Sequence, residues 1–472
     1  MNNALSRRRL RALLPIVVLL MGGCAATDTR DAADAGAASS PETFPMPREI
    51  EGNVAFWRKV YAHWSRGQVA LHDDEHLALV YEVITLPGPI GPGYTREQRD
   101  LIRNRTGYLR ARLKRLEARV AAGESLSTDE RALLEVISTQ AGPRALAGAH
   151  ERLRVQRGIS ERFRRGLEIS GRYEQAFRDI FRAAGLPEDL AYLPHVESSF
   201  QVSARSSAGA AGVWQFTRGT GKLYMNVNGA VDERLDPVIA AEGAARYLQD
   251  AYRRLGSWPL AVTSYNHGMG GMARAKGEFG NDLGRIVREY KGPLFGFASR
   301  NFYAEFLAAR EIASNPRDFF AEHINYRKPL AEDRLILPHS LPVRRIANHY
   351  GLSSSRLAEL NPAWRAPVRD GRVHLAAGSS LWLPQGTLVR VTSVPAPVPV
   401  LVAKADVPAN AARRSRPSGT GGGGRLHVVK PNETLYEVAL RYDLSVDKLR
   451  RLNRLSPRHT LIRPGQRLRV SI

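Results

Sequence analysis

A single glutamate, Glu197, is the residue of this chain best suited to move a proton on a sugar-like substrate. It opens the motif Glu-Ser-Ser-Phe at residues 197–200, and no further Asp or Glu occurs before Asp232. Most glycoside hydrolases use two carboxyl groups, one as the acid and one as the base or nucleophile. A single carboxyl can still cleave a glycoside if it protonates the leaving oxygen and then accepts a proton from a hydroxyl of the substrate itself.

A loop of small residues follows the glutamate and contains groups that could bind a sugar. Its glycines and alanines at residues 209–212 would let the backbone approach a ligand closely. Gln215 can both donate and accept hydrogen bonds. Ser206 is either an ordinary turn hydroxyl or a group near the glutamate. We expect Trp214 to fill the core, since its apolar area is large.

A short helix must position the glutamate. Pro187 suits a first helical position because its missing N–H would be unpaired there. The spacing of Leu190, Leu193 and Glu197 places the carboxyl on the apolar face of that helix. Pro194 predicts a kink within the segment. Burial on this face disfavours the charged form and raises the pKa of the carboxyl, as a general acid near neutral pH requires.

These motifs together resemble the catalytic domain of the lytic murein transglycosylases over residues 155–320. The resemblance rests on Glu-Ser-x-Phe, on Ser-x-x-Gly-Ala-Ala-Gly-x-Trp-Gln-Phe and on a later Tyr-Asn pair. It implies that Glu197 is the sole catalytic acid and base. The substrate-binding residues that it implies are Ser206, Gln215, Tyr265, Asn266 and, on a later helix, Tyr303.

The resemblance also implies a fold and a reaction. It predicts an α+β protein with a mainly α-helical, lysozyme-like catalytic domain and small βααβ modules. It further predicts cleavage of the MurNAc–GlcNAc bond of peptidoglycan without water, leaving a 1,6-anhydro-MurNAc end. No metal and no cofactor is expected, and the sequence contains no His-x-x-His pair or cysteine cluster.

The C-terminal part contains an internal repeat. The residue pattern that ends in Leu360-Asn361 recurs later in the chain, where it ends in Leu452-Asn453. Each copy is expected to form two helices followed by a short strand. The second copy, residues 426–471, has a full opening strand and turn and resembles a LysM domain, which binds N-acetylglucosamine glycans. The first copy, residues 333–385, is degenerate and is expected to pack without binding. Residues 386–425, rich in Pro, Ala and Gly, are expected to link the copies as a movable arm.

The N-terminal part predicts export and anchoring. Residues 1–24 combine three arginines, a short apolar run and a small-residue site ending at Cys24, the only cysteine of the chain. This pattern resembles a bacterial lipoprotein signal, which implies a lipidated Cys24 on the outer membrane facing the periplasm of a Gram-negative bacterium. Residues 25–45 read as a disordered tether. Residues 46–154 read as a helical extension with two short strands and a capping box, Ser127 to Glu130, that opens a helix. We expect a supporting role for this extension.

The composition is strongly basic. The 472 residues carry a formal net charge of +23. Nucleic acid is the usual partner of such a chain. The export signal and the even spread of Arg argue against it, and the charge would attract the protein to the carboxylates of peptidoglycan or to anionic lipid. We expect a monomer whose partners are glycan strands and, through its lipid, a membrane.

Two alternatives to a transglycosylase remain open at the level of the sequence. The first is a lysozyme-like hydrolase in which Asp232 or Asp236 activates water. The second is a wall-binding lipoprotein whose catalytic fold is inactive. The intact set of motif residues favours the enzyme over the second alternative.

Overall fold

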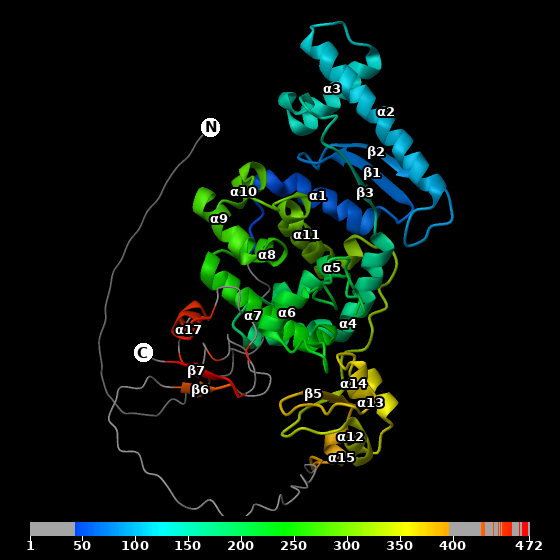
Figure 1. The fold of residues 1–472 in the computed structure, drawn as a ribbon. Helices are drawn as coiled ribbons and strands as arrows, with labels where there is room; N and C mark the ends of the chain where they lie inside the picture. Colours follow the sequence, from blue (N-terminus) through cyan, green and yellow to red (C-terminus); the bar gives the residue numbers. More distant parts are fainter. Residues whose placement is uncertain are drawn as a thin grey trace, which may run out of the picture. The chain divides into compact units, whose positions relative to one another are not determined.

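The computed structural model describes residues 43–395 and, further on, residues 426–429, 438, 442, 444, 446–455, 462 and 465–470. The chain divides into two compact units, residues 1–398 and 399–472 (Figure 1). The predicted signal with Cys24, nearly all of the predicted tether and most of the predicted linker lie outside the described residues. In the part that is described, no helix combines the length and the hydropathy that a membrane span needs.

Helices build the central body of the first unit, as the resemblance predicted, and the sheets of the chain are small and antiparallel. The helices of the body are α4 (Ser160–Ala183), α5 (Leu193–Glu197), α6 (Arg218–Tyr224), α7 (Pro237–Leu255), α8 (Trp258–His267), α9 (Met269–Phe279), α10 (Leu283–Glu289) and α11 (Phe297–Ser314) (Figure 1). They enclose one apolar core with large aromatic side chains, among them Phe177, Phe181, Trp214 and Phe306.

Helix α7 shows how local sequence fixes these elements. Asp236 caps its N-terminus, accepting hydrogen bonds from the N–H groups of Val238 and Ile239, and Pro237 takes the first helical position. Gly256 ends the helix in the left-handed conformation with φ 63°. Both ends are therefore set by residue types that the sequence shows directly.

The N-terminal extension contains a three-stranded antiparallel sheet in the order β2-β1-β3. The strands are β1 (Gln68–Asp73), β2 (Val80–Thr85) and β3 (Leu153–Arg157), and the helices are α2 (Arg96–Ala121) and α3 (Thr128–Ala141). The two strands predicted in this region are confirmed, whereas β3 was not predicted. Ser127 and Glu130 form the expected capping box at the start of α3.

The first α-helix of the described residues belongs to the core of the central body. Helix α1 (Glu51–Arg58) continues into a π-helical turn, Lys59–His63, and both pack against α11. Phe56, Val60 and Tyr61 are buried in the same cluster as the side chains of the central helices. The predicted extension, residues 46–154, therefore contributes its first α-helix to the core of the central body.

The first repeat copy forms a complete small module. Strand β4 (Asp333–Ile336) pairs antiparallel with β5 (Ser380–Leu383). Between them lie α12 (Val343–Tyr350), α13 (Ser354–Leu360) and α14 (Ala366–Arg369), and α15 (Thr387–Arg390) follows. The sequence pattern assigned a full opening strand to the second copy alone. The structure corrects this, since β4 opens the first copy in the same way.

The second copy repeats this arrangement in the described residues of the second unit. Strand β6 (Leu426–Val428) pairs with β7 (Arg467–Arg469), and α17 (Val446–Leu452) lies between them in the chain. The Asn453 amide donates to the carbonyls of Leu449 and Arg469 and accepts from the N–H of Arg469.

The equivalent asparagine of the first copy makes the same contacts. The Asn361 amide donates to the carbonyls of Leu357 and Trp382 and accepts from the N–H of Trp382. In each copy one asparagine thus ties the second helix to the closing strand. This shared network confirms the repeat that the sequence indicated.

Candidate active site

The segment that carries Glu197 consists of two short elements. A 3₁₀ turn, Glu188–Tyr192, precedes α5, and Pro194 lies in the first turn of α5. Pro187 is the N-cap residue, just before the 3₁₀ turn. The prediction of one kinked helix that begins at Pro187 is therefore wrong. A proline in the first turn has no N–H to pair, which lets the chain start a new helix there.

The Glu197 carboxyl sits at the end of α5, where the residue is half-buried. Burial, and secondarily the charge of Glu305, raises its pKa to about 8. This confirms the expected direction of the pKa shift. Among the described residues Glu197 forms no ion pair and no hydrogen bond. At neutral pH the group is therefore mostly protonated and free to donate its proton.

A second carboxyl, which the sequence did not reveal, belongs to the same site. Glu305 on α11 accepts a hydrogen bond of 3.1 Å from the Tyr61 hydroxyl. Burial raises the pKa of Glu305 to about 7, while this hydrogen bond acts to lower it. Burial first, and then the charges of Glu305 and Glu197, raise the pKa of Tyr61 well above its usual value. The three groups form one electrostatic cluster between α5, α11 and the π-helical turn.

The residues after Glu197 hold α5 against the following loop. The buried Ser198 hydroxyl donates to the carbonyl of Val213 over 2.8 Å. Ser199 and Phe200 adopt positive φ values of 51° and 56°. Such backbone is costly for non-glycine residues and persists where the surroundings enforce it. The fully buried Phe200 ring supplies that constraint.

The packing of the backbone requires a glycine at one position of the glycine-rich loop. Gly212 is buried with φ 79°, and a Cβ there would lie 1.8 Å from the carbonyl oxygen of Arg234. Gly209 has a similar φ of 78° but faces open space. The structure therefore corrects the expectation for Gly212, whose missing side chain admits the Arg234 backbone and not a ligand.

Ser206 and Gln215 shape this loop. The Ser206 hydroxyl, which is exposed, accepts from the N–H of Ala210 over 3.0 Å. The Gln215 amide donates to the carbonyl of Gly212 over 2.7 Å. Trp214 is fully buried, which confirms it as a core residue. In this state both polar side chains brace the loop, and only the Ser206 hydroxyl is exposed.

Tyr265 lies beside the glutamate. Its hydroxyl donates to the carbonyl of Trp214 over 3.0 Å. Burial and then the charge of Glu197 raise its pKa well above the usual value, so the hydroxyl stays protonated. Asn266 is exposed, and its Oδ1 accepts from the Ser299 hydroxyl over 2.8 Å. Tyr265 thus holds a neutral hydroxyl near the carboxyl, and Asn266 links α8 to α11.

The prediction for Tyr303 is not supported by its position. The Tyr303 side chain is buried, and its hydroxyl donates to the carbonyl of Pro45 over 2.9 Å. The preceding residue, Phe302, lies parallel to the Tyr265 ring with centroids 6.5 Å apart. Tyr303 is therefore a core residue. The side chains of α11 that interact with motif residues are Ser299, Phe302 and Glu305.

The two aspartates proposed as water-activating groups are both engaged elsewhere. Asp232 is fully buried and pairs with Arg234 at 2.8 Å and with Arg365 at 3.0 Å. Asp236 caps α7 and accepts from the indole N–H of Trp382 over 2.6 Å. These contacts tie the first repeat copy to the central body and leave neither carboxylate free to activate water.

Comparison with known proteins agrees with this arrangement. The model of the transglycosylase SLT domain matches residues 180–286, and the model of the LysM domain matches residues 427–471. The chain is 25% identical over 287 residues to membrane-bound lytic murein transglycosylase D of Escherichia coli (strain K12), covering 60% of this chain and 60% of that relative. The chain therefore spans somewhat more than half of the relative's length.

A second relative and a solved structure are also similar to this chain. Membrane-bound lytic murein transglycosylase F 2 of Alkalilimnicola ehrlichii is 30% identical over 167 residues, covering 33% of this chain and 36% of the relative. The 70 kDa soluble lytic transglycosylase of Escherichia coli matches with 17% identity and a TM-score of 0.27, covering 46% of this chain and 44% of that one. The chain therefore matches a transglycosylase SLT domain followed by a LysM domain, and it is similar to lytic transglycosylases.

Proposed function

We propose that this chain cleaves the MurNAc–GlcNAc bond of peptidoglycan without water and leaves a 1,6-anhydro-MurNAc end. The observation that carries the proposal is the state of Glu197, an unpaired carboxyl at the end of α5 whose pKa is raised to about 8. Such a group is protonated at neutral pH and can act as a general acid.

The proposed reaction needs only this carboxyl and the substrate. The Glu197 carboxyl donates its proton to the glycosidic oxygen as the C–O bond to the MurNAc anomeric carbon breaks. The resulting carboxylate then accepts the proton of the MurNAc primary hydroxyl as that oxygen bonds to the anomeric carbon. The proton count balances, and Glu197 ends as it began. Tyr265, protonated and adjacent, supplies a neutral hydroxyl dipole beside the changing charge.

Replacing Glu197 by Gln tests the assignment. The amide is nearly isosteric but cannot give up a proton, so we expect cleavage to fall by at least about 10²–10⁴-fold. Purified sacculi are digested and the soluble muropeptides are analysed by mass spectrometry. Glu278→Gln, on the exposed surface of α9, is the matched control and should retain full activity. Activity of Glu197→Gln within a few-fold of wild type would reject the role.

The same analysis separates the alternatives. A hydrolase remains the second candidate because Glu305 supplies the second carboxyl that most glycoside hydrolases use. Reducing ends in the wild-type digest would establish a hydrolase, and anhydro ends a transglycosylase. No product at all would favour a wall-binding protein.

We further propose that the LysM domain at residues 427–471 binds glycan strands and supplies avidity to a monomeric enzyme. The first copy, residues 333–385, acts instead as a fixed support, which its contacts through Asp232 and Asp236 favour.

The cell envelope is the expected location, since the relatives are membrane-bound lytic transglycosylases. We propose that residues 1–24 direct export and that a lipid on Cys24 anchors the protein to the outer membrane. Cys24→Ser should remove the protein from the lipidated membrane fraction. Unchanged membrane partition and unchanged mature mass of this variant would contradict the anchor.

A further inference from the structure

A pocket lies between the central body and the first repeat copy, outside the site described above. Its volume is about 530 Å³, which falls within the roughly 300–1,000 Å³ of typical ligand pockets. The first repeat copy contributes residues 362–367 and Arg369 to its wall. The central body contributes four residues, among them Arg205 and Asp232. The pocket is therefore large enough for a small organic ligand.

The wall of this pocket carries an excess of positive charge. Three of its lining residues are arginines, Arg205, Arg365 and Arg369. Asp232 is the one carboxylate among the described residues that line it. This aspartate is fully buried and is shared by two guanidinium groups, because it pairs with Arg365 at 3.0 Å and with Arg234 at 2.8 Å. One positive charge of these two arginines is therefore left uncompensated.

The other two arginines of the wall are free to meet a ligand. Arg205 and Arg369 are exposed, and in the described part of the chain neither side chain forms an ion pair or a hydrogen bond. Their N–H donors are accessible for the same reason. Together with the charge left over at Asp232, they give the pocket three uncompensated positive charges. A cleft lined by one sign of charge attracts the opposite sign, and guanidinium groups bind carboxylate or phosphate oxygens through paired N–H donors.

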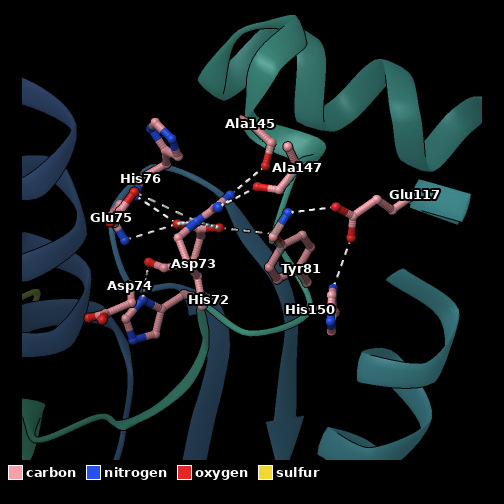
Figure 2. A network of polar contacts seen from close by, with 12 residues as sticks. His72, Asp73, Asp74, Glu75, His76, Tyr81, Glu117, Ala145, Ala147 and His150 are labelled. Atoms are coloured by element: carbon pink, nitrogen blue, oxygen red, sulfur yellow. Dashed lines mark hydrogen bonds and ion pairs between the residues drawn. The ribbon is translucent and has the colours of Figure 1, made fainter. Parts of the chain in front are cut away.

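The polar network around Asp73 in the N-terminal extension shows the opposite balance (Figure 2). Asp73 is also fully buried and pairs with Arg152 at 3.0 Å, but the same guanidinium lies 3.9 Å from a second carboxylate, that of Glu75. The backbone N–H groups of Glu75 and His76 complete the contacts of Asp73. A buried aspartate of this chain can thus be held without surplus cations. The need to hold Asp232 does not by itself account for the further arginines at the pocket.

Backbone contacts hold both sides of the pocket in place. The N–H of Asp232 donates to the carbonyl of Ala363 over 2.7 Å, and the N–H of Arg365 donates to the carbonyl of Ala230 over 2.9 Å. On the opposite wall, Arg205 forms an antiparallel backbone bridge within the glycine-rich loop. The arginines therefore project from a backbone that is fixed before a ligand arrives, which lowers the entropic cost of binding.

We propose that this pocket binds an anionic ligand that carries at least two carboxylate or phosphate groups. Arg205 and Arg369 contact the charged oxygens from the two sides of the pocket, and Arg365 adds a third positive charge. Three uncompensated charges favour such a ligand over one with a single carboxylate. The proposal does not depend on the proposed function, because no residue of the pocket belongs to the reacting groups around Glu197. It assigns a ligand-binding role to the first repeat copy beyond its role as a support.

Calorimetric titration of the full chain with citrate and with pyrophosphate tests the binding directly. We expect one site per chain for each anion, and acetate, which carries a single charge, should bind at least about tenfold more weakly. Added salt should weaken the binding, because it screens exposed charges. Arg205→Gln and Arg369→Gln should each weaken citrate binding by about tenfold. Arg205→Lys keeps the charge and should lose less affinity than Arg205→Gln.

Arg344→Gln is the matched control, since Arg344 is an exposed arginine on α12 of the same module and does not line the pocket. It removes the same charge and should bind citrate as the wild type does. The Tm of each variant monitors folding and should be unchanged, because the side chains of Arg205 and Arg369 form no ion pair or hydrogen bond with a described residue. Four results would overturn the proposal: no binding of either anion, many weak sites in place of one, acetate binding as tightly as citrate, or an equal loss of affinity in Arg344→Gln and the pocket variants.

Competition against citrate identifies the source of the anionic groups. The Glu197→Gln background is used here, so that added glycans stay intact. Displacement by a glycan that bears peptides with free carboxylates, but not by the same glycan without peptides, would support the proposal with the wall peptide as the source. Displacement by pyrophosphate alone would support it with a phosphate compound as the source. Displacement by the peptide-free glycan as strong as by the peptide-bearing one would count against an anion site.

Discussion

Glu305→Gln should move the alkaline limit of activity to lower pH. The Glu197 carboxyl must be protonated to act as an acid, and its pKa of about 8 places the alkaline limit of the wild type near pH 8. Above that limit the rate should fall about tenfold per pH unit. Glu305, with a pKa of about 7, is mostly charged in this range and helps to keep Glu197 protonated. Removing its charge lowers the pKa of Glu197.

The size of the shift follows from Coulomb's law. Two charges about 10 Å apart at an effective dielectric constant near 20 repel by about 1.7 kcal/mol, or about one pKa unit. A closer approach would enlarge the shift. We therefore expect Glu305→Gln to lower the limit by about one unit. Activity should be about tenfold below wild type at pH 9 and nearly unchanged at pH 6.

Initial rates of anhydro-muropeptide release from sacculi, measured between pH 5 and 10, provide the assay. Glu311→Gln on the same helix is the control and should keep the wild-type profile, because Glu311 pairs with Arg58. Circular dichroism at each pH monitors folding. An alkaline limit that stays in place in folded Glu305→Gln would refute the coupling between the two carboxyls. A loss of rate that is equal at every pH would refute it as well.

Three further predictions concern stability and binding. Glu197→Gln should raise the Tm above that of wild type more at pH 9 than at pH 4. The protonated Glu197 carboxyl contributes its full stability below the unfolded pKa of 4.5, and that stability is lost as pH rises through the folded pKa of about 8. Equal differences in Tm at both pH values would contradict this. In urea unfolding, Gly212→Ala should lower the free energy of unfolding by more than Gly209→Ala does. Both glycines have positive φ, but only at Gly212 would the added Cβ lie 1.8 Å from a carbonyl oxygen. Equal losses of stability would disprove the contact. Deleting residues 426–472 should weaken co-sedimentation with sacculi more than it slows cleavage of short soluble glycans, and unchanged sedimentation would reject the LysM role.

The sequence predicted those features that depend on local pattern. The capping box at Ser127 and the repeated Leu-Asn pair of the two C-terminal copies each follow from residues a few positions apart, and the structure contains them. The strand β3 was missed because it is short: Leu153 and Val155 alternate with polar residues, but two apolar residues are too few to distinguish a strand from a loop. Its pairing with β1 joins segments about eighty residues apart, which no local pattern reveals.

The motif residues of the site could likewise be found from their types, but their contacts could not. Gln215 and Ser206 have the chemistry of ligand-binding groups, yet in this state they hydrogen-bond to their own loop. Asp232 and Asp236 have the chemistry of catalytic carboxylates, yet Arg365 and Trp382 of a distant module engage them. A sequence shows which groups are available, whereas the fold decides which of them remain unpaired.

The side chains of helix α11 that lie near Glu197 could not be identified from the sequence either. Most of its residues are buried, so the periodicity of apolar residues does not reveal which face is turned to the active site. A tyrosine was the natural choice, but Tyr303 points to Pro45, while Glu305 meets Tyr61 from the π-helical turn after α1. The charge of Glu305, which helps to set the pKa of Glu197, is therefore held in place by the π-helical turn, some 140 residues before Glu197 in the chain. The π-helical turn after α1 is for this reason part of the proposed active site, and a chain shortened to the matched SLT residues, 180–286, would lack both Tyr61 and Glu305.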